Sequence, residues 1–326
     1  MEPNVPSIKT VDELMAHDYP PTTYLVDRLI PTESITILSG PSRNFKTYTL
    51  LDIAIAVASQ KPLFGHFATT QAEVLIINEE DGERLLQQRF RQLGIEQGSN
   101  LPIHISAMNG FTLTDTSVDE IIQLCGDDVK LVIIDSLIRV HSSDENSARE
   151  MSRVFAQLRK FTKAGIAVLV TQHHRKGNQH STGGASEMRG SSDILAAVDS
   201  HFAVTRKDSL YLTFTQEKQR YALELEPFQV KVHINDDSFR FEYLGALSKP
   251  ADKTTTLYTI VCNLLGEHKE LTIDELLEKI KVTNISTYKQ QLRELLKRWV
   301  AEGALPETRT DQNGRKLYSV ERPTNE

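Results

Sequence analysis

Five short segments of the chain consist almost entirely of apolar residues. They are Ile35–Ser39, Val74–Asn78, Leu131–Asp135, Ala167–Thr171 and His201–Thr205. Near-continuous runs of Val, Ile and Leu are typical of parallel strands that are covered on both faces. Helical spacing is found between them, at Tyr48–Ala58, Gly82–Leu93, Val118–Cys125 and Ala148–Ala164. This alternation of strands and helices predicts an α/β fold with a parallel sheet at its core.

The pattern changes after residue 209, where apolar and polar positions begin to alternate. The alternating segments are Leu210–Thr215, Phe228–Ile234 and Phe239–Tyr243. Such alternation is typical of antiparallel strands with one face in the core. We therefore expect an antiparallel extension at one edge of the parallel-core sheet.

The last part of the chain predicts a separate small domain. Composition changes near Gly245–Thr254, so we expect one domain at residues 1–245, a linker at 246–254, a second domain at 255–320 and a tail at 321–326. Helices are predicted at about Thr255–Leu265, Ile273–Lys281 and Ile285–Glu302. A hairpin over Arg309–Tyr318 would turn at Asn313-Gly314, a strong two-residue turn signal. Three helices and a hairpin form the pattern of a winged-helix domain.

The composition limits the class of protein. The 326 residues, 39% hydrophobic and 25% charged, suffice for about two domains. The two cysteines stand far apart, and the N-terminus lacks a secretory signal pattern, so we expect a cytoplasmic protein. The longest apolar run is too short to cross a membrane. With a net charge of −7, any nucleic-acid binding must come from local basic patches.

A polar loop joins the first of the apolar segments to the helix that follows it. The strand reaches Gly40, and Lys46 and Thr47 open the helix. In this order, backbone N–H groups and the positive end of the helix dipole face a polyphosphate. We expect Lys46 to reach the β- and γ-phosphates of ATP and the Thr47 hydroxyl to hold Mg²⁺. The nucleotide-binding residues that we expect are Gly40, Pro41, Ser42, Arg43, Asn44, Phe45, Lys46, Thr47 and Tyr48.

Phe45 departs from the usual form of this loop, G-x-x-x-x-G-K-[ST], because it stands where a second glycine is expected. If the position has a positive φ, a side chain there costs about 1–2 kcal/mol. If the backbone is already helical, the cost largely disappears. Taken alone, the segment is also compatible with a strand–turn–helix unit in which Lys46 and Thr47 follow by chance.

Acidic groups follow two further strands. Asp135 ends one, and Glu79, Glu80 and Asp81 follow another. Ligands of open α/β sheets bind at the carboxyl ends of the strands, so Asp135 is expected to meet the Mg²⁺ held by Thr47. Glu80 is expected to orient the attacking water, with its acidic neighbours as helix caps. The alternatives are a turn-capping Asp135 and a solvated acidic helix start.

Another strand ends in Thr171, followed by Gln172 and His173, which we expect at the γ-phosphate. Zinc binding by His173 and His174 is not expected, because adjacent side chains of an extended segment point opposite ways and no third ligand is evident. A long polar segment follows at Gly177–Glu187, closed by Met188–Ser192. Polar loops of this length are often functional.

Together these segments resemble the RecA-like core ATPases, over about the first 245 residues. The resemblance is to the branch of RepA-type hexameric replicative helicases, the AAA_25 group. It rests on Gly40–Thr47, Glu80-Asp81, Leu131–Ser136, Thr171–Lys176 and Arg189–Ser192, with the lead-in Pro20–Pro31. It implies ATP hydrolysis coupled to movement on nucleic acid, in a homo-oligomeric ring. Lys46, Glu80, Asp135 and Gln172 or His173 match the family's site residues, and members of this branch also carry Phe at the position of Phe45.

The same resemblance implies roles for residues outside the loop. Lys218 and Arg220 fall where relatives place a trans-acting Lys-x-Arg pair that reaches the ATP of a neighbouring subunit, a role that suits arginine. An exposed basic turn is the alternative. Leu137–Ala148, with Arg139 and His141, and Arg175–Met188, with Arg175 and Lys176, occupy the places of the channel loops that hold single-stranded DNA. These loops contain few cations.

The predicted winged helix has its own basic residues. Thr287, Tyr288, Lys289, Gln291 and Arg293 would be available to a DNA groove, and Lys297 and Arg298 follow. The hairpin adds Arg309, Arg315 and Lys316. A helix in the major groove with a basic wing on the phosphates is a known way to bind duplex DNA. Docking to a protein is the alternative, because the module is neutral overall.

Two functions of different classes remain open at this point. The first is a Mg²⁺-dependent ATPase acting on DNA, as a ring helicase of a plasmid, phage or other mobile element. The second is an ATP-binding, DNA-docking regulator or helicase loader that does not unwind DNA. A small-molecule kinase is a third, weaker alternative, because no arginine-rich lid segment is evident.

Overall fold

The computed structural model describes most of the chain. The residues described are 8–145, 147–173, 191–206, 208–247, 253–268, 270–281, 287, 289–302, 304–305, 309–310, 312, 314 and 316–319. The chain divides into two compact units, Met1–Leu247 and Ser248–Glu326, which we describe separately.

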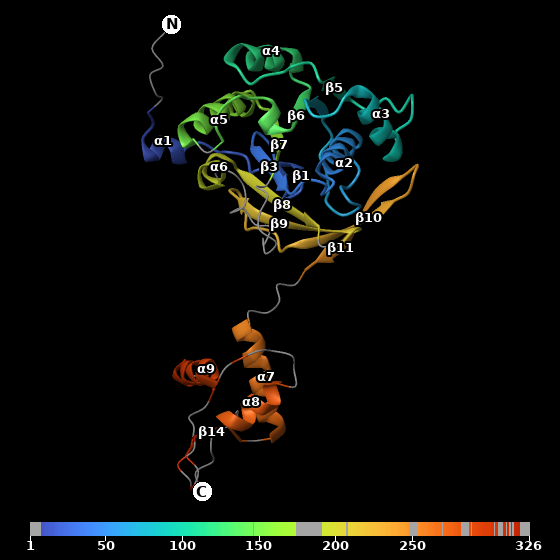
Figure 1. The fold of residues 1–326 in the computed structure, drawn as a ribbon. Coiled ribbons are helices and arrows are strands. Elements are labelled where there is room, and N and C mark those ends of the chain that lie inside the picture. Colours follow the sequence, from blue (N-terminus) through green and yellow to red (C-terminus); the bar gives the residue numbers. More distant parts are fainter. Residues whose placement is uncertain are drawn as a thin grey trace. The chain divides into compact units, whose positions relative to one another are not determined.

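A mixed sheet forms the centre of the first unit (Figure 1). Its described strands lie in the order β11-β10-β9-β8-β3-β7-β6-β4-β5. Neighbours from β8 to β5 are parallel, whereas β9, β10 and β11 are antiparallel. The bounds are β3 Ile35–Gly40, β4 Glu73–Asn78, β5 Ile103–Ala107, β6 Val129–Asp135, β7 Ala167–His173, β8 Ser200–Arg206, β9 Tyr211–Gln219, β10 Phe228–Ile234 and β11 Phe239–Ala246. The α/β class with a largely parallel central sheet is thereby confirmed.

Helices cover both faces of the parallel strands (Figure 1). One face packs against α2 (Lys46–Ser59) and α3 (Glu83–Gln92). The other packs against α4 (Asp115–Cys125), α5 (Ala148–Lys163) and α6 (Ser191–Ala197). Within β6, Leu131 and Ile133 face the first layer, and Val132 and Ile134 face the second. Burial of both faces explains why the parallel strands are continuously apolar.

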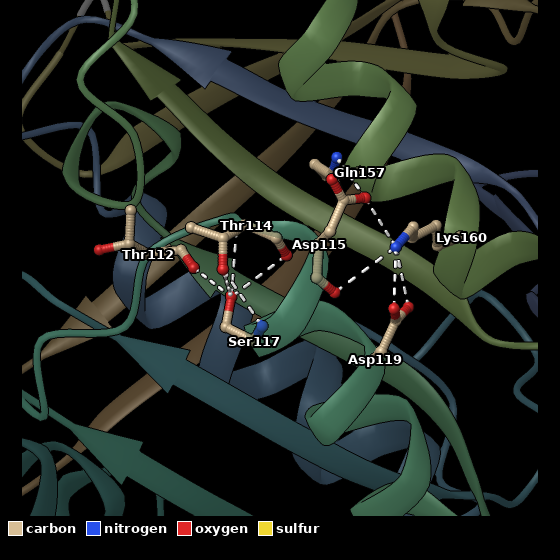
Figure 2. A network of polar contacts seen from close by, with 7 residues as sticks. All are labelled: Thr112, Thr114, Asp115, Ser117, Asp119, Gln157 and Lys160. Atoms are coloured by element: carbon tan, nitrogen blue, oxygen red, sulfur yellow. Dashed lines mark hydrogen bonds and ion pairs between the residues drawn. The ribbon is translucent and has the colours of Figure 1, made fainter.

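Polar contacts fasten α4 to α5 (Figure 2). Thr114 caps α4, where its Oγ1 accepts a hydrogen bond from the Ser117 N–H at 3.2 Å. From α5, the Lys160 ammonium lies 2.8 Å from Asp115 Oδ1 and 2.9 Å from Asp119 Oδ1. Gln157 also donates to Asp115 Oδ1, at 3.1 Å. These exposed polar contacts add to the apolar packing between α4 and α5.

Several elements of the first unit were not expected from the sequence. They are α1 (Val11–Met15), the short hairpin β1 (Tyr24–Val26) and β2 (Ile30–Pro31), the edge strand β5, the 3₁₀ turn η1 (Leu137–Arg139) and α6. β5 lacks an apolar run because it forms the edge of the sheet, where His104 and Ile105 are exposed. Edge strands carry exposed positions and so lose the pattern of a buried strand.

The second unit contains the helices α7 (Lys253–His268), α8 (Ile273–Lys281) and α9 (Lys289–Ala301). A small antiparallel sheet has the order β12-β14-β13, with β12 at Leu271–Thr272, β13 at Arg309–Thr310 and β14 at Lys316–Tyr318. The sequence did not indicate β12, which is two residues long. A core of its own, including Leu257, Leu276, Leu292 and Trp299, holds this unit together.

Among the residues that the structure describes, no helix is long and apolar enough to cross a membrane.

Candidate nucleotide site

Gly40 ends β3 where the loop must pass close to the neighbouring strand β8. A Cβ atom at Gly40 would lie 2.4 Å from the backbone oxygen of Val204, closer than real Cβ contacts allow. The buried Asn44 donates a hydrogen bond to the same oxygen at 3.1 Å. The glycine and the asparagine therefore hold the loop between β3 and α2 against β8.

Phe45 has a left-handed backbone conformation, with φ of 55° and ψ of 25°. Of the two cases considered above, the strained one therefore applies, at a cost of about 1–2 kcal/mol. The ring packs against Phe239 with a centroid distance of 5.2 Å and lies 5.0 Å from the Arg206 guanidinium carbon. These contacts offset part of the backbone strain.

Lys46 is buried at the first turn of α2. Its ammonium donates to the carbonyl oxygens of Gly40 and Pro41, both at 2.9 Å, and to His173 Nδ1 at 3.2 Å. Burial lowers the pKa of Lys46 to about 8, although the charges of Asp135 and Glu80 act to raise it. The ammonium is thus held by neutral acceptors close to two acids.

Thr47 and Asp135 meet at the carboxyl ends of β3 and β6. The Thr47 hydroxyl donates to Asp135 Oδ2 at 2.8 Å, and the Thr171 hydroxyl of β7 donates to Asp135 Oδ1 at 2.5 Å. Asp135 is only 2% exposed, and burial raises its pKa. Hydroxyl and carboxylate oxygens are ligands that Mg²⁺ prefers. The donor set therefore fits the expected cation.

The three acids after β4 have different surroundings. Glu79 accepts hydrogen bonds from the backbone N–H groups of Asn109, Gly110 and Phe111, at 3.0 to 3.2 Å. Asp81 forms an ion pair with Arg89 of α3. Glu80 Oε1 instead lies 3.6 Å from His173 Nε2, and its contact with His173 is the largest cause of its lowered pKa. Glu80 is therefore the acid of the three that reaches the Lys46–His173 pair.

Gln172 is 2% exposed at the end of β7, and neither polar atom of its amide has a hydrogen-bond partner. A buried amide left unpaired costs about 1–3 kcal/mol. Such a group at the strand ends fits a site that is completed by a polar ligand. The expected position beside the γ-phosphate stays a prediction.

Tyr48 lies on the α3 side of the loop. Its ring stacks on Phe239 at 3.9 Å, and its hydroxyl donates to Gln92 Oε1 at 2.5 Å. The side chains of Ser42 and Arg43 are exposed, and Pro41 is half-buried. The structure thus places all nine residues of the expected loop at the carboxyl ends of the parallel strands, which we call the rim. Lys46 and Thr47 are turned toward Asp135.

Lys218 and Arg220 do not join this rim. Their segment pairs with the beginning of β8, where Gln219 is opposite Ser200. The loop at Gly40 lies at the other end of β8, near Val204. Within one chain, these two cations and Lys46 therefore lie at opposite ends of the strands β3 and β8.

The residues expected to contact nucleic acid lie in both units. Arg139 is exposed in η1, and its charge contributes to the lowered pKa of Glu80. In the second unit, Lys289, Arg293 and Lys316 line a cleft of about 310 Å³, together with Lys297 and Asp274. Lys289 forms an ion pair with Asp274. Arg175, Lys176 and Arg315 are outside the described residues.

Sequence reasoning did not predict the contacts that two residues, Thr171 and Asn78, make beside the site. Thr171 binds the metal-site candidate Asp135, and the Asn78 Oδ1 accepts the backbone N–H groups of Glu80 and Asp81, at 2.9 and 2.7 Å. An Asn after a buried strand is a signal for a turn of this kind. Thr171 stood out in the sequence as the polar end of a buried strand, but its bond to Asp135 could not be predicted because Asp135 belongs to the neighbouring strand.

No group of three or more His, Cys, Asp or Glu residues in the described ranges is arranged to hold a metal ion alone. Mg²⁺ usually keeps several waters and substrate phosphates among its ligands, so a site with one carboxylate and one hydroxyl suits it.

Comparison with known proteins gives one family. The family model AAA_25, described as an AAA domain, matches residues 2–179, which is more than half of the chain. The matched range contains the loop at Gly40, the acids after β4, Asp135 and the end of β7. No curated protein shows a significant match to the chain.

Proposed function

The chain belongs to the AAA domain family of P-loop ATPases, and from this we propose that it is a Mg²⁺-dependent ATPase that acts on DNA as a ring-forming replicative helicase. The observation that carries the proposal is the convergence of Lys46, Thr47, Asp135 and Glu80 at one rim of the parallel sheet. Resemblance of the strand-end motifs to the RepA-type branch supports the helicase role and an origin in a plasmid, phage or other mobile element.

Lys46 is the residue that we expect to bind the phosphates of ATP. In the structure its ammonium donates hydrogen bonds to two carbonyl groups and to His173. A triphosphate offers charged acceptors in their place, and charge-assisted hydrogen bonds are roughly twice as strong as neutral ones. Binding of ATP would also raise the pKa of Lys46 and keep the ammonium protonated.

Thr47 and Asp135 are the residues that would hold Mg²⁺. When bound, the ion supplies positive charge that stabilises the charge developing on the transferred phosphoryl group. The buried Asp135 carboxylate, whose pKa is raised, would then be paired with a cation.

Glu80 is our candidate for the group that positions the attacking water. Its lowered pKa keeps the carboxylate ionised near neutral pH. His173 lies between it and Lys46, within 3.6 Å of the carboxylate and in hydrogen-bond contact with the ammonium. The unpaired amide of Gln172 is available to the γ-phosphate.

The test is an ATPase assay with and without single-stranded DNA. Glu80→Gln should lower kcat by about 100-fold or more while ATP binding persists, since general-base contributions are typically about 10²–10⁴-fold. Glu83→Gln, an exposed acid in the same region, is the matched control. Lys46→Ala should abolish turnover, and full activity of that variant would refute the site.

A regulator or helicase loader is the second candidate. The segment Leu137–Ala148 supports it, because Asp144 and Glu145 outnumber Arg139 there and weaken attraction to a DNA backbone. A winged-helix role for the second unit, supported by its basic cleft, would then provide the DNA contact. Strand displacement on a forked duplex separates the two candidates, because a loader would bind ATP and DNA without unwinding.

A further inference from the structure

Asp199, which precedes β8, is a fully buried carboxylate with 0% exposure. Its Oδ2 accepts a hydrogen bond from the backbone N–H of Ile35 at 2.9 Å, at the start of β3. Two guanidinium groups also bind it. Arg159 Nη1 of α5 lies 2.5 Å from Oδ2, and Arg220 Nη1 lies 2.9 Å from Oδ1. A buried carboxylate of this kind strongly orients the cations that neutralise it.

Arg159 and Arg220 differ in what else they contact. Arg159 Nη2 also donates to the carbonyl of Ala197 at 2.6 Å, so both terminal nitrogens of its guanidinium group have partners inside the protein. The Arg220 side chain is 47% exposed, and its backbone N–H donates to the Asp199 carbonyl at 2.9 Å. Arg159 therefore fixes Asp199 from within, while Asp199 fixes Arg220 at the surface.

A second cation, Lys218, lies near Arg220. Lys218 donates to the carbonyl of Leu195 at 2.5 Å, and burial together with the charge of Arg220 lowers its pKa. The charges of Arg159, Arg220 and Asp199 all act on Lys218. A half-exposed guanidinium that a buried carboxylate holds in place, such as Arg220, suits contact with an anion from outside the chain.

The anion cannot be a nucleotide bound to the same chain. Asp199 bonds to Ile35 at the start of β3, whereas the phosphate loop follows Gly40 at its end. The strand between them extends for roughly 17 Å, at about 3.3 Å per residue. In the proposed ring, a neighbouring copy of the chain would bring its triphosphate to Arg220.

We propose that Asp199, fixed by Arg159, is a positioning residue that holds Arg220 for contact with the ATP of a neighbouring copy. This inference rests on the proposed ATPase function and assigns Asp199 and Arg159 to it. Arg220 would stabilise charge on the transferred phosphoryl group. The size of this effect would depend on the orientation in which Asp199 holds its guanidinium group.

The first measurement is steady-state ATP hydrolysis by the full chain. We expect Asp199→Asn to lower kcat by about 10–100-fold with KM little changed, because a small misplacement of a catalytic group can cost about 10²-fold. Arg220→Ala should show the same pattern. Wild-type kcat in either variant would overturn the inference. If the wild-type chain hydrolyses no ATP, the proposed function fails first and this inference fails with it.

A mixing experiment excludes a purely structural role for Asp199. Lys46→Ala copies have a defective loop and an intact Arg220, and Asp199→Asn copies have the reverse. Mixed assemblies should therefore regain activity above the sum of the two variants, as should mixtures of Lys46→Ala with Arg220→Ala. Recovery with Arg220→Ala but not with Asp199→Asn would overturn the inference, because Asp199 would then support its own fold only.

Arg159→Lys decides the question if Asp199→Asn does not fold. Lysine keeps the positive charge but loses the planar fork that contacts both Asp199 oxygens and Ala197. We expect a fall in kcat with unchanged ATP binding. Arg153→Lys, an exposed arginine on the same helix, is the matched control. Equal kcat values for the two variants would overturn the inference.

Discussion

Phe45 is the residue at which backbone strain and side-chain packing oppose each other most directly. Its φ of 55° favours glycine, while its ring contacts Phe239 and Arg206. Phe45→Ala should lose the ring contacts and keep the strain, whereas Phe45→Gly should lose both. We therefore expect the glycine variant to be more stable than the alanine variant by about 1 kcal/mol.

Chemical denaturation of the two variants measures this difference directly. Because both lack the ring, lost packing cancels in the comparison. An alanine variant as stable as the glycine variant would contradict the left-handed conformation of residue 45. The ATPase rates of the pair would show in addition whether the ring itself matters for hydrolysis.

The lowered pKa of Lys46 predicts that the stability of the nucleotide-free protein depends on pH. Its pKa is about 8 in the folded protein and about 10.5 when unfolded, so the unfolded chain binds more protons between these values. Stability therefore rises with pH in this window, as the cost of burying the ammonium disappears. Relative to Lys46→Met, the wild-type free energy of unfolding should increase by about 1–2 kcal/mol between pH 8 and 9.5.

The measurement is denaturation of both proteins across this pH range. Other groups that titrate there affect both proteins alike and cancel in the difference. A difference that stays constant with pH, or shrinks as pH rises, would mean that Lys46 is not buried as a charged group beside Asp135.

Individual site residues were predictable to different degrees. Lys46, Thr47 and Asp135 lie at strand ends or the first helical turn, so local pattern placed them at one rim. Glu80 was chosen from the sequence over Glu79 and Asp81, but the contacts that distinguish the three acids could not be predicted, because they are made with Phe111, His173 and Arg89. Side-chain partners across strands depend on tertiary contacts that periodicity does not encode.

At the scale of elements, buried strands and amphipathic helices were the most predictable. The four helices predicted between the parallel strands correspond to α2, α3, α4 and α5, with starts that differ by three residues or fewer. β5 and α6 were missed for different reasons. β5 is an exposed edge, and α6 is a single short helix after a long polar segment, where composition favours a loop.

The cleft between α9 and β14 predicts a charge-dependent interaction. If it binds duplex DNA, Arg293→Ala combined with Lys316→Ala should weaken binding and lower the slope of log affinity against log salt by about 2, roughly 1 per phosphate contact. Arg298→Ala is the matched control, since Arg298 pairs with Glu302 and does not line the cleft.

Fluorescence anisotropy with a labelled duplex at several salt concentrations gives both the affinity and the slope. Equal salt slopes for the double variant and the control would show that the cleft does not neutralise DNA phosphates. The second unit would then be better explained as a protein-docking module.

At the scale of the whole molecule, the two units have separate cores and separate candidate sites. The nucleotide rim draws its described residues from the first unit alone, and the basic cleft from the second alone. A fragment ending at Leu247 should therefore bind ATP within about threefold of the full chain, less than about 0.7 kcal/mol. It should lose whatever duplex affinity the cleft supplies.

Titration of a fluorescent ATP analogue against fragment and full chain tests this division, with Lys46→Ala in the fragment as the negative control. The folded state of the fragment is checked by its unfolding transition, since both apolar faces of the central sheet remain covered by its own helices. Loss of nucleotide binding from a folded fragment would mean that the second unit contributes to the rim. If the fragment retains nucleotide binding but loses DNA-stimulated hydrolysis, the first unit binds ATP and the second unit is needed for the response to DNA.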